Sequence, residues 1–169
     1  MLKLTPDYYF DKFSDASVDF LLSIGVKGVL MDVDNTLEPY ENPTPGENVK
    51  AWINALRSAG IGCAIVSNNN GERIRLFNSE LSLPAYYRAK KPFSKNLKRA
   101  LSDLSVEKGE AIFIGDQIFT DVLAARFFGI RAILVPPIKD KTDPFTRFKR
   151  LLERPILKRY KKIHKNKEE

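Results

Sequence analysis

The sequence has little cysteine and no long apolar segment. Cys63 is the single cysteine among 169 residues, so an internal disulfide is excluded. No apolar run approaches the ~18 residues that a membrane-spanning helix needs. Residues 1–13 include Asp7 and Asp11 and lack a long apolar stretch, which does not match a signal peptide. We therefore expect a cytoplasmic protein, peripheral to a membrane at most.

Excess charge is absent from most of the chain and concentrated at its C-terminal end. Residues 139–169 contain 12 Lys and Arg against 5 Asp and Glu, whereas residues 1–138 contain 16 of each kind. The net charge of +7 therefore lies in the tail. We predict a folded domain over residues 1–138 and a basic, helical tail over residues 139–169 that contacts an anionic surface, either membrane or nucleic acid.

The tail carries an apolar stripe at helical spacing. Asp143 is suited to cap a helix that has Pro144 in its first turn. The stripe consists of Phe145, Phe148, Leu152, Ile156, Tyr160 and Ile163, and basic residues fill the other faces. Two interpretations stay open, because such a helix either lies on a membrane surface or packs its stripe against the domain.

Short apolar segments alternate with amphipathic ones along the domain. The predicted strands are residues 29–33, 61–66, 86–88, 111–114 and 130–135. The predicted helices are one capped by Thr44 and ended by Gly60, one over residues 72–78, one capped by Ser94 that bears Leu97 and Leu104, and one over residues 122–128. Cys63 and Trp52 are assigned to the core. This alternation predicts an α/β, Rossmann-like three-layer fold with a parallel central sheet.

Polar residues follow several of the predicted strands. In parallel sheets, ligands bind beyond the carboxyl ends of the strands, so we expect these residues to share one rim. Each segment alone is also compatible with a turn or a helix cap, and adjacent lysines alone are more often a solvated face. The residues are Asp32, Asp34 and Thr36 after the first strand, Ser67, Asn68, Asn69 and Asn70 after the second, Lys90 and Lys91 further on, and Asp116 and Asp121 after residues 111–114.

The chemistry of this set favours phosphate and magnesium. Asp32 and Asp34 would repel each other unless a cation lay between them, and Asp116 supplies a third carboxylate. A cluster of carboxylate oxygens suits Mg²⁺, which also binds substrate phosphate. The Ser67 hydroxyl and the Asn68 amide can donate to phosphoryl oxygens, and a lysine adds positive charge where the phosphoryl group is negative.

The ordered segments resemble a known family. DVDNT over residues 32–36, VSN over 66–68, KKP over 90–92 and GDQIFTD over 115–121 are similar to the four motifs of the haloacid dehalogenase (HAD) superfamily of phosphohydrolases. The longer strings DVDNTLE, VSNNN and GDQIFTDVL resemble the subclass IIIA group called YqeG-like phosphatases, which is in turn similar to mitochondrial phosphatidylglycerophosphate phosphatases.

The resemblance implies catalytic roles for three residues. Asp32 would be the nucleophile and form an aspartyl-phosphate intermediate. Asp34 would protonate the leaving group and then deprotonate the attacking water. Lys91, which precedes Pro92, matches the family lysine better than Lys90 does.

The resemblance also implies ligands for the metal and the phosphate. Asp32, the backbone carbonyl of Asp34 and Asp116 would hold Mg²⁺, with Asp121 supporting them directly or through water. Ser67 and Asn68 would bind the phosphoryl oxygens. Thr36 would orient the first loop and is grouped with the residues that bind phosphate.

Motif spacing limits what can cover the site. Residues 37–66 include a predicted helix and leave no room for a cap domain, so the site should be open to a large or surface-bound phosphate ester. We predict a Mg²⁺-dependent phosphatase that hydrolyses a phosphate monoester, with a lipid phosphate such as phosphatidylglycerophosphate as the first candidate. The alternative is a catalytically weak binding protein of the same fold whose basic tail engages RNA or a ribosome.

Overall fold

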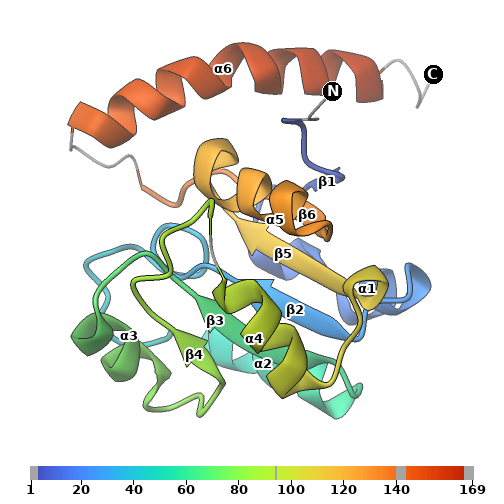
Figure 1. Ribbon diagram of the computed structural model, residues 1–169, viewed down its shortest axis with the longest axis vertical. Helices are drawn as coiled ribbons and strands as arrows, with labels where there is room; N and C mark the ends of the chain where they lie inside the picture. Colours follow the sequence, from blue (N-terminus) through green and yellow to red (C-terminus); the bar gives the residue numbers. More distant parts are fainter. Residues whose placement is uncertain (1–3, 94, 140–143, 166–169) are drawn as a thin grey trace.

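A single parallel sheet forms the centre of the protein (Figure 1). The computed structural model describes residues 4–93, 95–139 and 144–165. The strand order is β1-β6-β5-β2-β3-β4, and every pair is parallel. The strands are β1 (Tyr8–Tyr9), β2 (Gly28–Met31), β3 (Gly62–Val66), β4 (Ala85–Tyr86), β5 (Ala111–Gly115) and β6 (Arg131–Leu134).

Alternate side chains of the central strands enter two separate cores. On β2, Val29 and Met31 pack on one face and Leu30 on the other, and all three are fully buried. The first face is covered by α1 (Val18–Ser23), α2 (Glu47–Ser58) and α3 (Gly71–Asn78). The second is covered by α4 (Asn96–Leu104), the π-helical turn η3 (Ile118–Val122) and α5 (Leu123–Phe128). This is the predicted Rossmann-like α/β arrangement, and it is confirmed.

The five predicted strands are all present, with small differences in their limits. The predicted strand over residues 86–88 is instead β4, Ala85–Tyr86, because Arg88 takes a left-handed conformation with φ of 46° that a strand cannot accommodate. The predicted helix over residues 122–128 begins earlier, in the turn η3 that contains Asp121. The sequence analysis missed β1 and α1, which are short elements near the N-terminus.

The predicted start of α2 was wrong. The N-cap is Gly46, and neither Thr44 nor Pro45 lies in the helix. The Gly46 N–H donates to Glu38 Oε1 at 2.8 Å, so an acceptor from the preceding loop replaces the expected threonine cap. Ser94 and Asp143, the other two predicted caps, lie outside the described residues.

The C-terminal segment forms one long helix, α6 (Pro144–Lys165), drawn in red across one end of the molecule in Figure 1. Its predicted apolar stripe is divided. Tyr160 is buried and Ile156 packs against the second core, whereas Phe145 and Phe148 are exposed at 70% and 57%. The side of α6 that faces the domain is polar in its first half, where Thr146 and Glu153 are buried.

The described residues contain neither a cap domain nor a helix that could span a membrane. The stretch between β2 and β3 contains α2 and loops, so no separate cap domain is present among the described residues. In the described part of the chain, no helix has the length and apolar character needed to cross a membrane.

Candidate active site

The polar residues predicted to share a rim do come together. Strands β5, β2 and β3 are neighbours at the centre of the sheet and run in the same direction. Asp32 follows β2, Ser67 follows β3 and Asp116 follows β5, and all three are buried. The parallel register therefore delivers a carboxylate, a hydroxyl and a second carboxylate to one end of the sheet.

Lys91 joins two of the acidic residues. Its Nζ lies 3.0 Å from Asp32 Oδ1 and 2.7 Å from Asp121 Oδ1, and its side chain is 1% exposed. Burial alone would lower the pKa of this ammonium, but the charges of Asp121 and Asp32 raise it above its usual value. Lys91 is therefore a fixed positive charge beside Asp32. Lys90 is exposed, so the structure places Lys91, and not Lys90, in the site.

Three carboxylates converge where a metal ion was predicted. Asp32, Asp116 and Asp121 each present an oxygen, and these oxygens lie within 4.8 Å of one another. Burial, followed by the charges of Asp121 and Asp32, raises the pKa of Asp116 to about 7. A Cβ at Gly115 would lie 2.4 Å from the Asp121 carboxyl carbon, so only glycine allows this approach. The three carboxylates therefore stay close although their negative charges repel one another, because Lys91 and the space left by Gly115 fix Asp121.

Both carboxylate oxygens of Asp34 are engaged. Oδ1 forms an ion pair with Arg73, at 3.2 Å from Nε and 3.1 Å from Nη2. Oδ2 accepts from Asn69 Nδ2 at 2.7 Å. Arg73 also donates to the Pro43 carbonyl, which ties α3 to the loop after β2. These contacts orient Asp34 toward the cavity, which its side chain lines.

Three further predicted residues have distinct positions. The Ser67 hydroxyl accepts from Asn69 N at 3.1 Å and retains its own proton for donation. The Asn68 side chain accepts from Lys91 N at 2.7 Å, so it holds the loop that carries Lys91. Thr36, grouped above with the phosphate ligands, is buried and donates to Asp116 Oδ1 at 3.2 Å. Its position suits orientation of Asp116 rather than contact with substrate.

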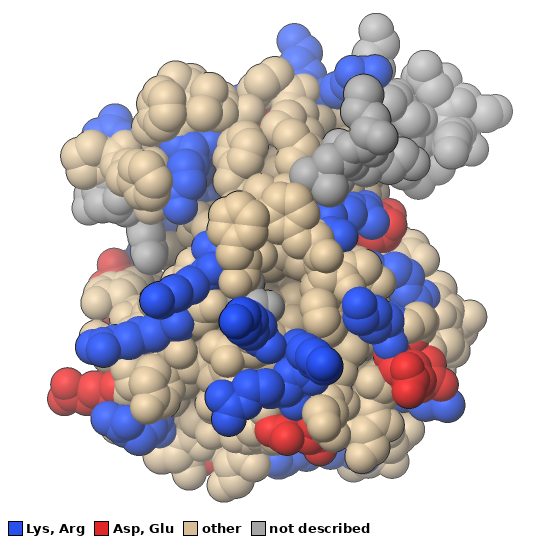
Figure 2. Space-filling model, in the orientation of Figure 1, with Lys and Arg blue, Asp and Glu red and all other residues tan. Residues whose placement is uncertain are grey.

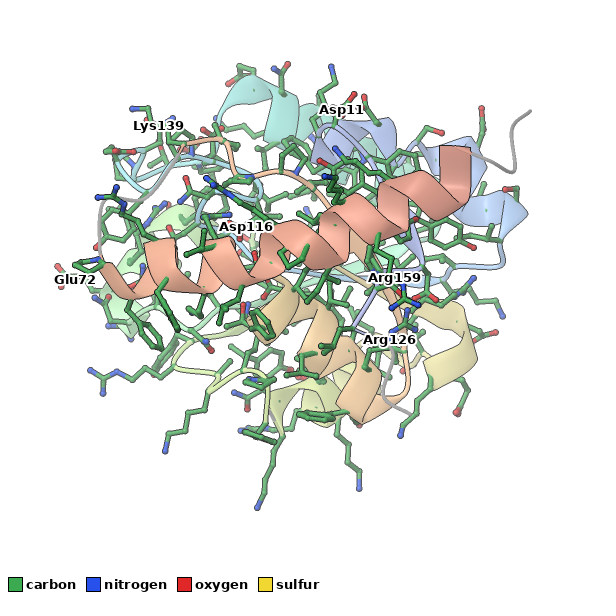
Figure 3. The ribbon with its side chains drawn as sticks, turned by 90° about the horizontal axis from the view of Figure 1, so that it is seen from above. Asp11, Glu72, Asp116, Arg126, Lys139 and Arg159 are labelled. Atoms are coloured by element: carbon green, nitrogen blue, oxygen red, sulfur yellow. The ribbon has the colours of Figure 1, made fainter. Side chains whose placement is uncertain are left out.

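The first half of α6 reaches the same site from the opposite side. Asp116, labelled in Figure 3, lies beneath this part of the helix. Arg150 Nη2 lies 2.7 Å from Asp116 Oδ2. The Glu153 carboxylate accepts from the backbone N–H groups of Ile118 and Phe119, at 2.7 and 3.2 Å. The tail is therefore attached to the loop that carries Asp116 and Asp121.

A cavity of about 330 Å³ lies between these two sides. Its strand-end side includes Asp32, Asp34, Ser67, Asn68, Asn69 and Lys91, and Tyr40, Gln117 and Thr120 also line it. Its other side is formed by Thr146 and Lys149 of α6. The cavity places the predicted nucleophile, acid–base residue and phosphate donors around one space.

Sequence reasoning missed the basic residues that fix the site. Arg73 and Arg150 lie outside the strand-end segments, and each has the sequence environment of an ordinary helical arginine. No pattern in the sequence points from Arg73 to Asp34, and none points from Arg150 to Asp116.

Comparison with protein families then decides the identity. A family model of haloacid dehalogenase-like hydrolases matches residues 26–135, which include the end of every central strand. The chain belongs to this family. The predicted family is thereby confirmed, and with the first of the relatives below so is the predicted class of enzyme, a phosphatase.

Two relatives of known sequence agree with the assignment. The chain is 36% identical over 157 residues to "Probable phosphatase YqeG" of Bacillus subtilis, covering 93% of this chain and 91% of that protein. It is 26% identical over 147 residues to "Phosphatidylglycerophosphate phosphatase 1, chloroplastic/mitochondrial" of Arabidopsis thaliana, covering 80% of this chain and 42% of that longer protein.

Solved structures support the fold. An uncharacterized protein from Listeria monocytogenes aligns with a TM-score of 0.53 at 19% identity, over 70% of this chain and 85% of the other. A 3-deoxy-D-manno-octulosonate 8-phosphate phosphatase from Yersinia pestis aligns with a TM-score of 0.51 at 13% identity, over 73% and 78%. At these identities the likeness concerns the fold alone.

Proposed function

We propose that the protein hydrolyses a phosphate monoester with Mg²⁺ as cofactor and Asp32 as nucleophile. The observation that carries this proposal is the convergence of Asp32, Asp116 and Asp121 around the buried Lys91 ammonium. An open cavity with hydroxyl and amide donors adjoins this cluster. Within a family of hydrolases, this arrangement suits attack of a carboxylate on phosphorus.

The residues fit a magnesium ion. The three carboxylate oxygens lie within 4.8 Å of one another, and carboxylate oxygens are ligands that Mg²⁺ prefers in proteins. With all groups ionised, the three carboxylates exceed Lys91 and Arg150 by one negative charge. A divalent cation would make this balance positive and thereby suit a dianionic phosphoryl group. Asp32, the Asp34 carbonyl and Asp116 would hold the ion, with Asp121 in support, and the ion would neutralise charge between Asp32 and the phosphoryl oxygens.

The reaction then proceeds in two displacements at phosphorus. An Asp32 oxygen attacks the phosphorus atom, the bond to the leaving oxygen breaks, and Asp34 gives that oxygen a proton. The Ser67 hydroxyl, the backbone amide of Asn68 and the Lys91 ammonium stabilise the charge on the phosphoryl oxygens. Asp34 next takes a proton from water as the water attacks phosphorus, the bond to Asp32 breaks, and inorganic phosphate leaves.

The test is an assay of the purified protein with a panel of phosphorylated metabolites, lipids and peptides. Phosphate should be released in the presence of Mg²⁺ and release should stop when a chelator is added. Full activity in chelator would contradict the metal site. Absence of activity on every class of phosphate ester would instead favour the alternative, a binding protein with this fold.

Among substrates, a lipid phosphate such as phosphatidylglycerophosphate is our first candidate, and α6 supplies the structural support. Phe145, Phe148, Leu151 and Leu152 are all exposed on its first half, next to the cavity. Figure 2 shows Lys and Arg side chains gathered over the face that includes α4, with few acidic groups among them. The first half of α6 itself carries the exposed residues Arg147 and Arg154. Exposed apolar side chains together with basic ones on one helix suit an anionic lipid surface.

Peripheral membrane contact can be tested with matched leucine pairs. We expect Leu151→Ser with Leu152→Ser to weaken co-sedimentation with anionic vesicles, because these side chains would lose apolar burial. The control is Leu22→Ser with Leu76→Ser, which are exposed to a similar degree, at 49% and 48% against 56% and 46%, on other helices. Equal binding by the two variants would remove the membrane interpretation. Binding to RNA and not to vesicles would favour the nucleic-acid alternative.

A further inference from the structure

We infer that Lys149 forms a second anion-binding subsite, which selects phosphate monoesters whose alcohol part carries another anionic group. This inference rests on the proposed phosphatase function and concerns the substrate class of the same cavity. It follows from a difference between the two lysines that line the cavity, Lys91 and Lys149.

The positive charge of Lys91 is already matched by carboxylates. Its Nζ contacts both Asp32 and Asp121, and the other basic side chains at the site, Arg73 and Arg150, are paired with Asp34 and Asp116. These cations stabilise the catalytic carboxylates. They are therefore committed to the reacting end of the cavity.

Lys149 is held only by neutral groups as far as the structure describes the chain. Its Nζ donates to Gln117 Oε1 at 3.1 Å and lies 4.8 Å from the centre of the Phe145 ring. No carboxylate of the described residues lies within ion-pair distance of it. An oriented, half-buried ammonium without an acidic partner is suited to bind an anionic ligand.

The position of Lys149 identifies which part of the substrate it meets. The phosphoryl group would lie against Asp32, Ser67 and Lys91 on the strand-end side. Lys149 belongs to α6, which forms the other side, so it faces the leaving alcohol. A phosphodiester or a carboxylate on that alcohol could accept a charge-assisted hydrogen bond from the Lys149 ammonium, whereas a neutral alcohol would form no ion pair with it.

The experiment compares two soluble substrates that differ in one anionic group. These are glycerol 1-phosphate and the same molecule with a methyl phosphodiester on its third carbon. The measured quantity is the ratio of kcat/KM for the diester-bearing substrate to that for glycerol 1-phosphate. We expect Lys149→Gln to lower this ratio ~10-fold, the usual effect of losing one charge-assisted hydrogen bond. Lys149→Glu should lower it further, and Lys149→Arg should restore most of it.

The matched control is Lys158→Gln, an exposed lysine on the same helix that does not line the cavity. It removes the same charge and should leave the ratio unchanged. An unchanged ratio in Lys149→Gln, or the same fall in Lys158→Gln, would overturn the inference. If Lys149→Gln instead detached α6 from the domain, both kcat/KM values would fall together and their ratio would stay the same. A further fall of the ratio in Lys149→Glu and its recovery in Lys149→Arg would distinguish loss of the subsite from loss of α6 docking. Absence of wild-type activity on both substrates and on the wider panel would refute the proposed function instead.

Discussion

The two sides of the cavity are built from different kinds of structure. On one side, the ends of β2, β3 and β5 belong to a parallel sheet that is buried on both faces, so Asp32, Ser67 and Asp116 have little freedom. On the other side, α6 approaches the site through polar contacts, chiefly those of Arg150 and Glu153.

This difference suggests a division of roles. Chemistry needs groups fixed to within a fraction of an ångström, which the sheet provides. A helix attached by a few polar bonds can vary without disturbing the sheet, so it is suited to substrate selection and surface contact. If this division is correct, changes on the sheet side should cost far more activity than changes on α6.

The largest effect on activity is expected at the ion pair between Asp116 and Arg150, to which each side of the cavity contributes one residue. Asp116→Ala should lower kcat/KM on the order of 1000-fold at limiting Mg²⁺, since a metal ligand is lost. Arg150→Ala should lower kcat/KM at limiting Mg²⁺ by only ~10- to 100-fold, as for a residue that orients a metal ligand. Mg²⁺ titrations of both variants make the comparison, and equal losses would contradict the division of roles.

Arg73 tests how strictly Asp34 must be oriented. Arg73→Gln removes the ion pair with Asp34 Oδ1 while the Asn69 contact to Oδ2 remains. We expect kcat to fall ~10- to 100-fold, because a misaligned acid–base residue affects both displacements. KM should change little, and Arg73→Lys should recover part of kcat. A rise in KM with kcat intact would show that Arg73 binds substrate instead of positioning Asp34.

The smallest effect on activity is expected at Glu153, which attaches α6 to the turn η3. Glu153→Ala leaves the N–H groups of Ile118 and Phe119 without their acceptor, at a cost of ~1–3 kcal/mol in the free energy of unfolding. Glu153→Gln keeps an acceptor oxygen and should cost less. Urea denaturation gives both values. An unchanged stability of Glu153→Ala would show that α6 does not depend on this contact.

The sequence was sufficient for five strands of the sheet, β2 to β6, and for the rim, because both follow local rules. Apolar runs of β-strand length predict the strands, and polar residues directly after them must lie at one edge. Asp32, Ser67 and Asp116 were found in this way, whereas Lys91 was identified through the family resemblance. The resemblance favoured Lys91 over Lys90 because Lys91 precedes Pro92, and the buried position of Lys91 between Asp32 and Asp121 agrees with that choice.

The contacts between α6 and the candidate active site could not be predicted from the sequence, and the reason is physical. Its hydrophobic pattern indicated an apolar stripe that either packs or faces a membrane. The structure instead turns the polar residues Thr146, Arg150 and Glu153 toward the domain in the first half of the helix. The partners of Arg150 and Glu153 lie 34 and 35 residues away along the chain, so no local pattern encodes these contacts. The separate tail, residues 139–169, remains a prediction.

Detection of the covalent intermediate tests the central claim most directly. The protein is mixed with substrate and Mg²⁺, quenched in acid, and its intact mass is measured. The account predicts a species heavier by one phosphoryl group in the wild type, on Asp32 after peptide mapping, and none in Asp32→Asn. A phosphorylated Asp32→Asn variant, or wild-type turnover with no phosphorylated protein at any quench time, would contradict Asp32 as the nucleophile.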